Sequence, residues 1–226
     1  MDTTTERARA LLAGIEQLAL RHGRPPGSVT LVGVAKMHAA DAIRAAWEGG
    51  LRHVGESYLQ EALPKIAALA DLPLTWHFVG RVQANKTAAV ARSFDWVHAL
   101  DRLHIAERLS AQRPSGREPL NCCIAVDLSG EESKGGVLPE ALHELAGAVA
   151  ALPRLRLRGL MVLPAPASEL AAQRIPFARL ARLLAGLRAA HPGLDTLSMG
   201  MSDDMEAAIA EGATLVRIGT ALFGAR

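Results

Sequence analysis

The chain has 226 residues, of which 50% are hydrophobic and 21% are charged, and this composition excludes intrinsic disorder, a collagen-like fibre and a small disulfide-stapled domain. Its 25 lysines and arginines nearly balance its 23 aspartates and glutamates, which leaves a net charge of +2. So small a charge argues against nucleic acid as a partner, because a phosphate polymer needs a broad basic surface.

Short apolar runs typical of strands alternate with alanine-rich helical segments along the whole chain. An amphipathic helix is predicted first, over residues 3–22, and it ends before a loop rich in glycine and proline at 23–27. Eight strands are predicted after it, over 29–35, 52–55, 74–80, 96–99, 120–128, 155–163, 196–199 and 214–218. Between them the sequence predicts helices over 40–48, 58–69, 85–92, 102–112, 139–152, 176–190 and 203–211.

This alternation determines the predicted fold class. Strands separated by helices imply right-handed crossovers and a parallel sheet. Eight such units fit a closed (β/α)8 TIM barrel of the α/β class, with an open doubly wound sheet as the alternative. No linker or change of composition divides residues 1–226, so we predict a single domain. In a barrel the site lies at the carboxyl ends of the strands.

The two cysteines and the amino terminus indicate a reducing compartment. Cys122 and Cys123 are neighbours in a strand-like run and point to opposite faces of it, where a disulfide between them is geometrically poor. The first residues lack the layout of a signal peptide, and no apolar run approaches the roughly 18 residues that span a bilayer. We therefore predict a cytoplasmic protein without a membrane partner. No CxxC, HExxH or histidine cluster indicates a metal site.

The first predicted strand delivers Lys36 at its carboxyl end, where a barrel directs it toward the mouth. A partly dry pocket favours the neutral form of an amine, which can attack an aldehyde and form a Schiff base. On spacing alone, the commoner interpretation is a strand-end lysine whose stem packs on apolar surface while its ammonium reaches water.

Two turns near the carboxyl terminus have the composition of a phosphate-binding cup. Gly200 permits a tight turn after the seventh strand, and Ser202 either caps the next helix or offers its hydroxyl to a phosphate. Gly219 and Thr220 follow the eighth strand and can supply backbone amides and a hydroxyl. The loops after the last two strands of a barrel commonly bind phosphate.

Taken alone, each of these turns is more often an ordinary connection between a strand and a helix, without a ligand. Asp203 and Asp204 would also repel a phosphate unless their carboxylates point away from it. Taken together with Lys36 on the adjoining first strand, the turns describe a lysine beside a phosphate site. That combination suits pyridoxal 5'-phosphate.

Over essentially its full length the chain resembles the pyridoxal phosphate homeostasis protein family, of the YggS and PROSC type. The segments that carry the resemblance are Val34-Ala35-Lys36, Val54-Gly55-Glu56-Ser57-Tyr58-Leu59-Gln60-Glu61, Trp76-His77-Phe78-Val79-Gly80 with Gln83 and Asn85-Lys86, Ser133-Lys134-Gly135, Arg158-Gly159-Leu160-Met161, and the stretches around Met199 and Arg217. The resemblance implies a barrel related to the amino-terminal domain of alanine racemase. It also implies pyridoxal 5'-phosphate held as an aldimine on Lys36, and a role in intracellular vitamin B6 homeostasis without an established catalytic reaction.

The resemblance places phosphate binding on Ser202, Gly219 and Thr220, and it sets Arg217 against the pyridine nitrogen of the cofactor. Because arginine stays protonated, it cannot readily donate a proton to that nitrogen, and the ring is then a poorer electron sink. A salt-bridged strand-end arginine is the alternative interpretation.

The chain departs from the usual family pattern beside the lysine. Ala35 replaces the commoner serine, Met37 replaces a threonine, and a proline is missing near Ala39. Ser57 replaces an asparagine, so any hydrogen bond to the ring oxygen has to come from a shorter side chain.

His77, Met199 and Gly200 complete the predicted cofactor-binding set. His77 either ends the third strand and lines the pocket, or it is a hydrogen-bonded core residue, which is the commoner state beside Trp76 and Phe78. Met199 either packs around the ring or fills a gap in the core. No catalytic residue and no metal ligand is predicted.

Three functions stay open, and the first is the one we predict. It is a monomeric, non-enzymatic carrier that buffers the reactive aldehyde and makes transient contact with apo-enzymes. The second is a weak racemase that uses the cofactor, in which water or His77 serves the face opposite Lys36; against it, the chain has one tyrosine, Tyr58, and lacks the second domain that supplies this group in related racemases. The third is a cofactor-free Schiff-base aldolase acting on a sugar phosphate.

Overall fold

The computed structural model describes residues 3–129 and 135–224. Eight parallel strands close into a barrel in chain order, with β8 hydrogen-bonded to β1. The strands are β1 (Thr30–Val34), β2 (His53–Glu56), β3 (Thr75–Arg81), β4 (Trp96–Leu100), β5 (Leu120–Ala125), β6 (Leu155–Met161), β7 (Thr196–Ser198) and β8 (Leu215–Ile218). The predicted (β/α)8 TIM barrel is therefore confirmed, and the open sheet is excluded.

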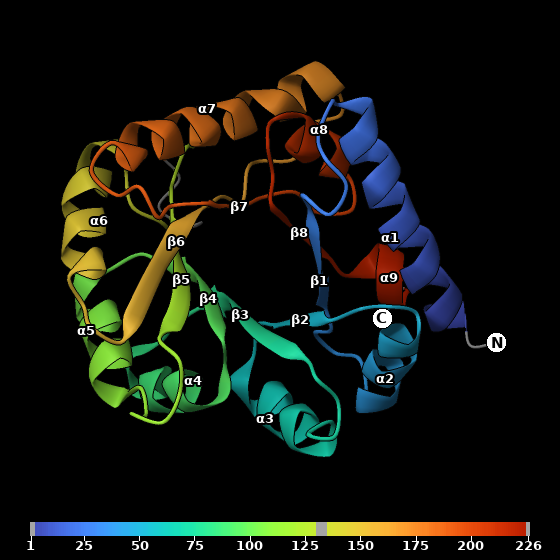
Figure 1. Ribbon diagram of the computed structural model, residues 1–226, viewed down its shortest axis with the longest axis horizontal. Coiled ribbons are helices and arrows are strands. Elements are labelled where there is room, and N and C mark those ends of the chain that lie inside the picture. The colour runs from blue at the N-terminus through green and yellow to red at the C-terminus, as the bar shows by residue number, and fades with distance from the viewer. Residues whose placement is uncertain (1–2, 130–134, 225–226) are drawn as a thin grey trace.

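A ring of helices surrounds the strands (Figure 1). The helices are α1 (Thr3–Arg21), α2 (Ala40–Glu48), α3 (Leu59–Ala68), α4 (Thr87–Ser93), α5 (Leu103–Gln112), α6 (Leu142–Ala150), α7 (Leu170–Arg188), α8 (Met205–Ala210) and α9 (Thr220–Phe223), with 3₁₀ turns η1 (Ala84–Lys86) and η3 (Pro139–Ala141). The four-residue helix α9 was not predicted from the sequence. It is too short to cover β8, and the opening helix α1 packs against α2, α8 and α9 at this position (Figure 1).

Helix α7 differs most from its predicted bounds. The prediction of 176–190 treated Pro176 as a helix start, whereas α7 begins at Leu170 and keeps Pro176 in its interior. A proline there forfeits one backbone hydrogen bond. The side-chain amide of Gln173 anchors the early turns by donating to the carbonyl oxygens of Ala167 at 2.8 Å and Asp203 at 3.2 Å. These bonds tie the turns before Pro176 to the preceding loop and to the turn after β7.

Two predicted strands also end early. The run 120–128 leaves the sheet after Ala125, and the run 155–163 leaves it after Met161. The apolar residues beyond these ends, Val126, Val162 and Leu163, line a cavity instead of extending the barrel.

Apolar side chains form one large core between strands and helices and a small cluster inside the barrel. Cys122 belongs to the outer core, while Cys123 lies inside with Ala125 and Met161. The predicted opposite orientation of the two free cysteines is thus confirmed. Burial raises the pKa of Cys122 to about 12 and raises the pKa of Cys123 as well, so neither thiol is an accessible nucleophile.

Candidate functional site

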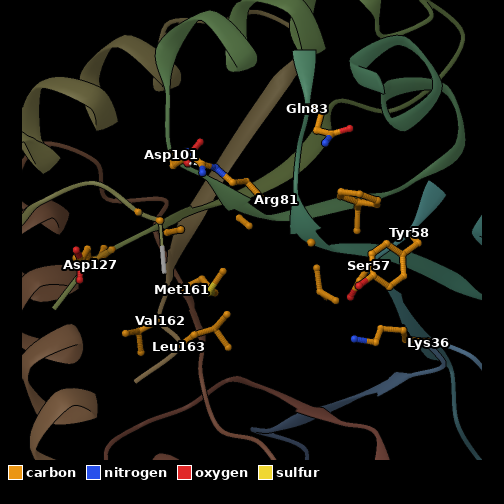
Figure 2. A pocket seen from close by; sticks show the side chains of 18 of the residues that line it. Lys36, Ser57, Tyr58, Arg81, Gln83, Asp101, Asp127, Met161, Val162 and Leu163 are labelled. Carbon is orange, nitrogen blue, oxygen red and sulfur yellow. Dashed lines mark hydrogen bonds and ion pairs between the residues drawn. The ribbon is translucent and has the colours of Figure 1, made fainter. Parts of the chain in front are cut away.

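A cavity of about 530 Å³ opens where strands β1 to β6 end (Figure 2). Its volume lies in the range that accommodates small organic ligands. Each of these strands contributes at least one residue at or just beyond its carboxyl end: Lys36, Ser57, Arg81, Ala99, Ala125 and Met161. The cavity is therefore at the end of the barrel where the sequence placed the site.

Lys36 carries the amine that the sequence analysis singled out. Figure 2 shows its side chain directed into the cavity, close to Tyr58 and Ser57. The Lys36 Nζ atom lies 5.3 Å from the centre of the Tyr58 ring. Within residues 3–129 and 135–224 this amine has no hydrogen bond and no ion pair. It is thus available to an incoming ligand.

The backbone on both sides of Lys36 is held by side chains of helix α3. Lys65 Nζ donates to the carbonyl oxygen of Ala35 at 2.9 Å and to Glu56 Oε1 at 2.7 Å. Glu61 Oε2 accepts the N–H of Met37 at 2.8 Å. Met37 has a φ of +64°, a left-handed conformation that a side chain normally avoids. The hydrogen bonds at Ala35 and Met37 fix this turn, and they thereby fix the backbone position from which the Lys36 side chain extends.

Lys65 was not singled out from the sequence, although a signal existed. Glu61 and Lys65 stand four residues apart on one helix, and their charged atoms are 3.7 Å apart. Their contact with strand β1 depends on tertiary packing, which the spacing does not reveal. Glu56 is fully buried, and burial raises its pKa even though the Lys65 hydrogen bond acts in the opposite direction.

The turn after β8 lies beside Lys36. Strand β8 pairs with β1 so that Ile218 is opposite Gly33. The following Gly219 and Thr220 are therefore level with Val34 and Ala35, next to the lysine at the same rim of the barrel. A Cβ atom on Gly219 would lie 3.3 Å from the carbonyl oxygen of Val34, so glycine permits this close approach. Thr220 is exposed and begins α9.

The turn after β7 lies on the other side of β8. Gly200 has a φ of +94°, and a Cβ atom there would lie 2.6 Å from Ala208 Cβ, so only glycine fits. The Gly200 carbonyl accepts the N–H of Arg217 at 2.9 Å. Asp204 Oδ1 accepts the N–H of Met201 at 2.6 Å, so this carboxylate is engaged within its own turn. The half-buried Ser202 lies in the same turn.

Arg217 is only 5% exposed. Its guanidinium donates to Ser198 Oγ at 2.7 Å and to the carbonyl oxygen of Val162 at 2.9 Å. It forms no ion pair with a carboxylate in the described part of the chain, so the salt-bridged alternative is not what the structure contains. Burial lowers the pKa of Arg217 to about 10, partly offset by Asp204, and the group remains charged at neutral pH.

Of the predicted cofactor-binding residues, Lys36 and Ser57 line the cavity. Its wall does not include the others: His77, Met199, Gly200, Ser202, Arg217, Gly219 and Thr220. The expectation that His77 ends the third strand is wrong, because β3 continues to Arg81 and it is the later residues that reach the cavity. His77 is fully buried inside the barrel and hydrogen-bonds to His53 and His98. Met199 is fully buried in the outer core.

Several cavity residues were not predicted as site residues. Arg81 Nε donates to Asp101 Oδ2 at 3.0 Å, and Arg102 Nε donates to Asp101 Oδ1 at 2.8 Å. Figure 2 shows the Arg81 and Asp101 pair across the cavity from Lys36, with Asp127 farther along the wall. Their positions after strand ends were a usable signal. No sequence pattern, however, brings residues of three separate strands together.

The buried histidines give the first testable prediction. Burial, with a further effect of Arg217, lowers the pKa of His98 to about 3, and burial also holds the pKa of His77 well below its usual value. Below pH 6.5 the unfolded chain therefore binds more protons than the folded chain, and the free energy of unfolding should fall by about 1.4 kcal/mol per pH unit for each such histidine. Urea unfolding between pH 4.5 and 7 measures this slope.

Carboxylates contribute to the same slope, so variants are needed to isolate the histidines. His98→Gln should make the slope shallower, whereas substitution of the exposed His104 by glutamine should leave it unchanged. Equal slopes in the wild type and His98→Gln would contradict the assignment.

The chain matches the family model described as alanine racemase, N-terminal domain, over residues 8–226. It is 58% identical over 226 residues to the pyridoxal phosphate homeostasis protein of Pseudomonas aeruginosa, covering 100% of this chain and 97% of that protein. The solved structure of PipY from Synechococcus elongatus with PLP bound is 39% identical, with a TM-score of 0.82, covering 93% of this chain and 99% of that one.

A more distant likeness concerns the fold alone. Alanine racemase of Corynebacterium glutamicum is 18% identical with a TM-score of 0.74, and the match covers 100% of this chain and 62% of the racemase. Ser133 and Lys134, quoted above as a matching segment, lie outside the described residues.

Two further results concern the described residues as a set. None of their helices combines the length and the apolar character needed to cross a membrane. No three of their His, Cys, Asp or Glu side chains are grouped so as to hold a metal ion.

Proposed function

This chain belongs to the pyridoxal phosphate homeostasis protein family, and from that membership we propose that it holds pyridoxal 5'-phosphate reversibly on Lys36 and serves intracellular vitamin B6 homeostasis without a catalytic reaction of its own. One observation carries this proposal. The Lys36 amine has no hydrogen bond or ion pair with the described residues, faces a cavity of about 530 Å³, and lies beside the Gly219-Thr220 turn.

The groups present fit the cofactor. A primary amine, a turn that only glycine can form at Gly200 and a buried, permanently charged guanidinium at Arg217 match the aldehyde, phosphate and ring of pyridoxal 5'-phosphate. Ser202, Gly219 and Thr220 would hold the phosphate. Asp204 Oδ1 accepts a backbone N–H of its own turn, so that oxygen is engaged within the turn.

Pyridoxal 5'-phosphate would supply an aldehyde, a group that a primary amine can attack with loss of water. Lys36 provides that amine, and the clamp formed by Lys65 and Glu61 keeps its backbone in one place. Arg217 would leave the ring nitrogen without a proton, because an arginine does not readily give one up. Ser57 lines the cavity near Lys36, and its hydroxyl would be the donor to a ring oxygen.

The distribution of polar groups favours a carrier over a racemase. A two-base racemase needs an acid or base on each face of its substrate. Tyr58, the one tyrosine of the chain, lies on the same side as Lys36. The described wall across from the lysine contains the apolar Met161, Val162 and Leu163 together with the Arg81 and Asp101 pair (Figure 2). The Asp101 carboxylate accepts from Arg81 at 3.0 Å and from Arg102 at 2.8 Å, so it is held by two cations. We therefore assign no catalytic residue.

We further propose that the chain acts as one domain, as a monomer in the cytoplasm, and that it makes transient contact with apo-enzymes to which it passes the cofactor. These points follow from the predicted role and from the sequence.

Spectral titration tests the proposed function. Adding pyridoxal 5'-phosphate to the purified protein should produce a visible absorption band, and borohydride should fix the cofactor to the peptide that contains Lys36. Holo-protein incubated with single-enantiomer amino acids in deuterated water should incorporate no α-deuterium. Useful incorporation would favour the racemase, and inactivation by borohydride only after a sugar phosphate is added would favour the aldolase.

A further inference from the structure

A continuous line of hydrogen bonds crosses the interior of the barrel from β2 to β8. His53 Nδ1 contacts His77 Nε2 at 3.0 Å, and His77 Nδ1 contacts His98 Nε2 at 2.8 Å. His98 Nδ1 contacts Ser198 Oγ at 2.7 Å, and that oxygen accepts from the Arg217 guanidinium at 2.7 Å. Four of these five side chains are at most 5% exposed.

The direction of this line follows from the chemistry of its last member. A guanidinium can only donate, so Ser198 Oγ must accept from Arg217. His98 Nδ1 is the one acceptor that the described residues offer to the Ser198 hydroxyl hydrogen. His98 then donates from Nε2 to His77, and His77 donates from Nε2 to His53. All three imidazoles are therefore neutral and carry their proton on Nε2.

An ordered line of this kind has an electrostatic effect. Every member turns the negative end of its dipole toward Arg217, so the dipoles together stabilise a buried cation that has no carboxylate partner among the described residues. Stacking of His77 on Trp96, with ring centres 5.5 Å apart, helps to keep the imidazoles in place. A carboxylate in their place would neutralise the guanidinium.

We propose that Ser198, His98, His77 and His53 are positioning residues that hold Arg217 charged and oriented for the cofactor. Only the claim that Arg217 is oriented for the cofactor rests on the proposed function. The order of the hydrogen bonds does not, because it is expected in the protein without cofactor as well. The line does not conduct protons to the site, since it ends on a guanidinium that is already fully protonated and does not release its proton at neutral pH.

Nitrogen-15 NMR of the histidine side chains tests the order directly. In cofactor-free protein at neutral pH, two-bond correlation spectra should show His53, His77 and His98 as Nε2–H tautomers. The exposed His104 and His143 should show the tautomer mixture of free histidine. An Nδ1–H tautomer or a mixture at His98 or His77 would overturn the proposal, whether or not the protein binds the cofactor.

Ser198→Ala tests the positioning role. Removing the hydroxyl should release His98 from its single tautomer, weaken cofactor binding about tenfold and shift the absorption of the bound cofactor, which is the scale expected when a hydrogen bond to a charged group is lost. Ser110→Ala is a matched control, because Ser110 is buried but lies on helix α5, outside the barrel. Unchanged affinity and absorption in a folded Ser198→Ala variant would overturn the role. If that variant does not fold, the wild-type NMR spectrum still tests the order of the hydrogen bonds, and a tautomer other than Nε2–H at His98 or His77 would overturn the proposal.

Discussion

Lys36→Ala is expected to reduce the borohydride-fixed cofactor adduct to the level of a blank and to abolish the visible absorption band that the covalent adduct produces. The reason is chemical, because alanine leaves no amine at the carboxyl end of β1 to condense with an aldehyde. Peptide mapping after reduction and the visible spectrum measure the effect. A weaker, non-covalent association through the phosphate turns should remain.

Lys86→Ala is the matched control. Lys86 lines the same cavity but belongs to η1 and is not on the strand next to β8. It should keep the band and the adduct. An adduct that survives in Lys36→Ala, or that is lost only in Lys86→Ala, would show that the proposed attachment site is wrong.

Gly159→Ala is expected to destabilise the barrel by about 3 kcal/mol or more and to lower the melting temperature by about 10 °C. Gly159 on β6 pairs with Thr196 on β7, and an added Cβ would lie 1.8 Å from the Thr196 carbonyl oxygen. The clash is with backbone, so the two strands must separate before the methyl group fits. Thermal and urea unfolding measure the loss.

The control for this prediction is Gly147→Ala. Gly147 lies in helix α6, and nothing is within 4 Å of a Cβ built there. Alanine should stabilise the helix by about 0.5 to 1 kcal/mol, because glycine is a poor helix former. A melting temperature of Gly159→Ala within a degree or two of the wild type would show that β6 and β7 are less closely packed than the structure indicates.

Most of the fold was predictable because each strand of a parallel barrel is buried on both faces and appears as a short apolar run. The errors occur where other contacts decide the outcome. Pro176 lies inside α7, where the preceding turns are held by Gln173, a contact that the local sequence pattern does not reveal. Helix α9 was not predicted because a segment of four residues is too short to show a periodic pattern.

The candidate site was predictable where one residue follows one strand, as Lys36 follows β1. The expectation that His77 ends a strand was wrong, because the predicted run 74–80 and the observed β3 both continue past it. The hydrogen bonds among His53, His77 and His98 could not be predicted, because each histidine lies on a different strand. The role of Lys65 was not predicted for a similar reason, since its contact with Ala35 depends on how α3 packs against β1.

The clamp around Lys36, formed by Lys65 and Glu61, acts on the main chain and leaves the amine without a hydrogen bond or ion pair among the described residues. Main-chain atoms at Ala35 and Met37 are fixed, while the amine can turn about its own side-chain bonds. The attachment point of the side chain is therefore rigid, while the side chain itself is mobile. Condensation of the amine with an aldehyde and the reverse hydrolysis take place at the end of this side chain. The motion that accompanies them requires only rotamer changes, which leave the barrel undisturbed.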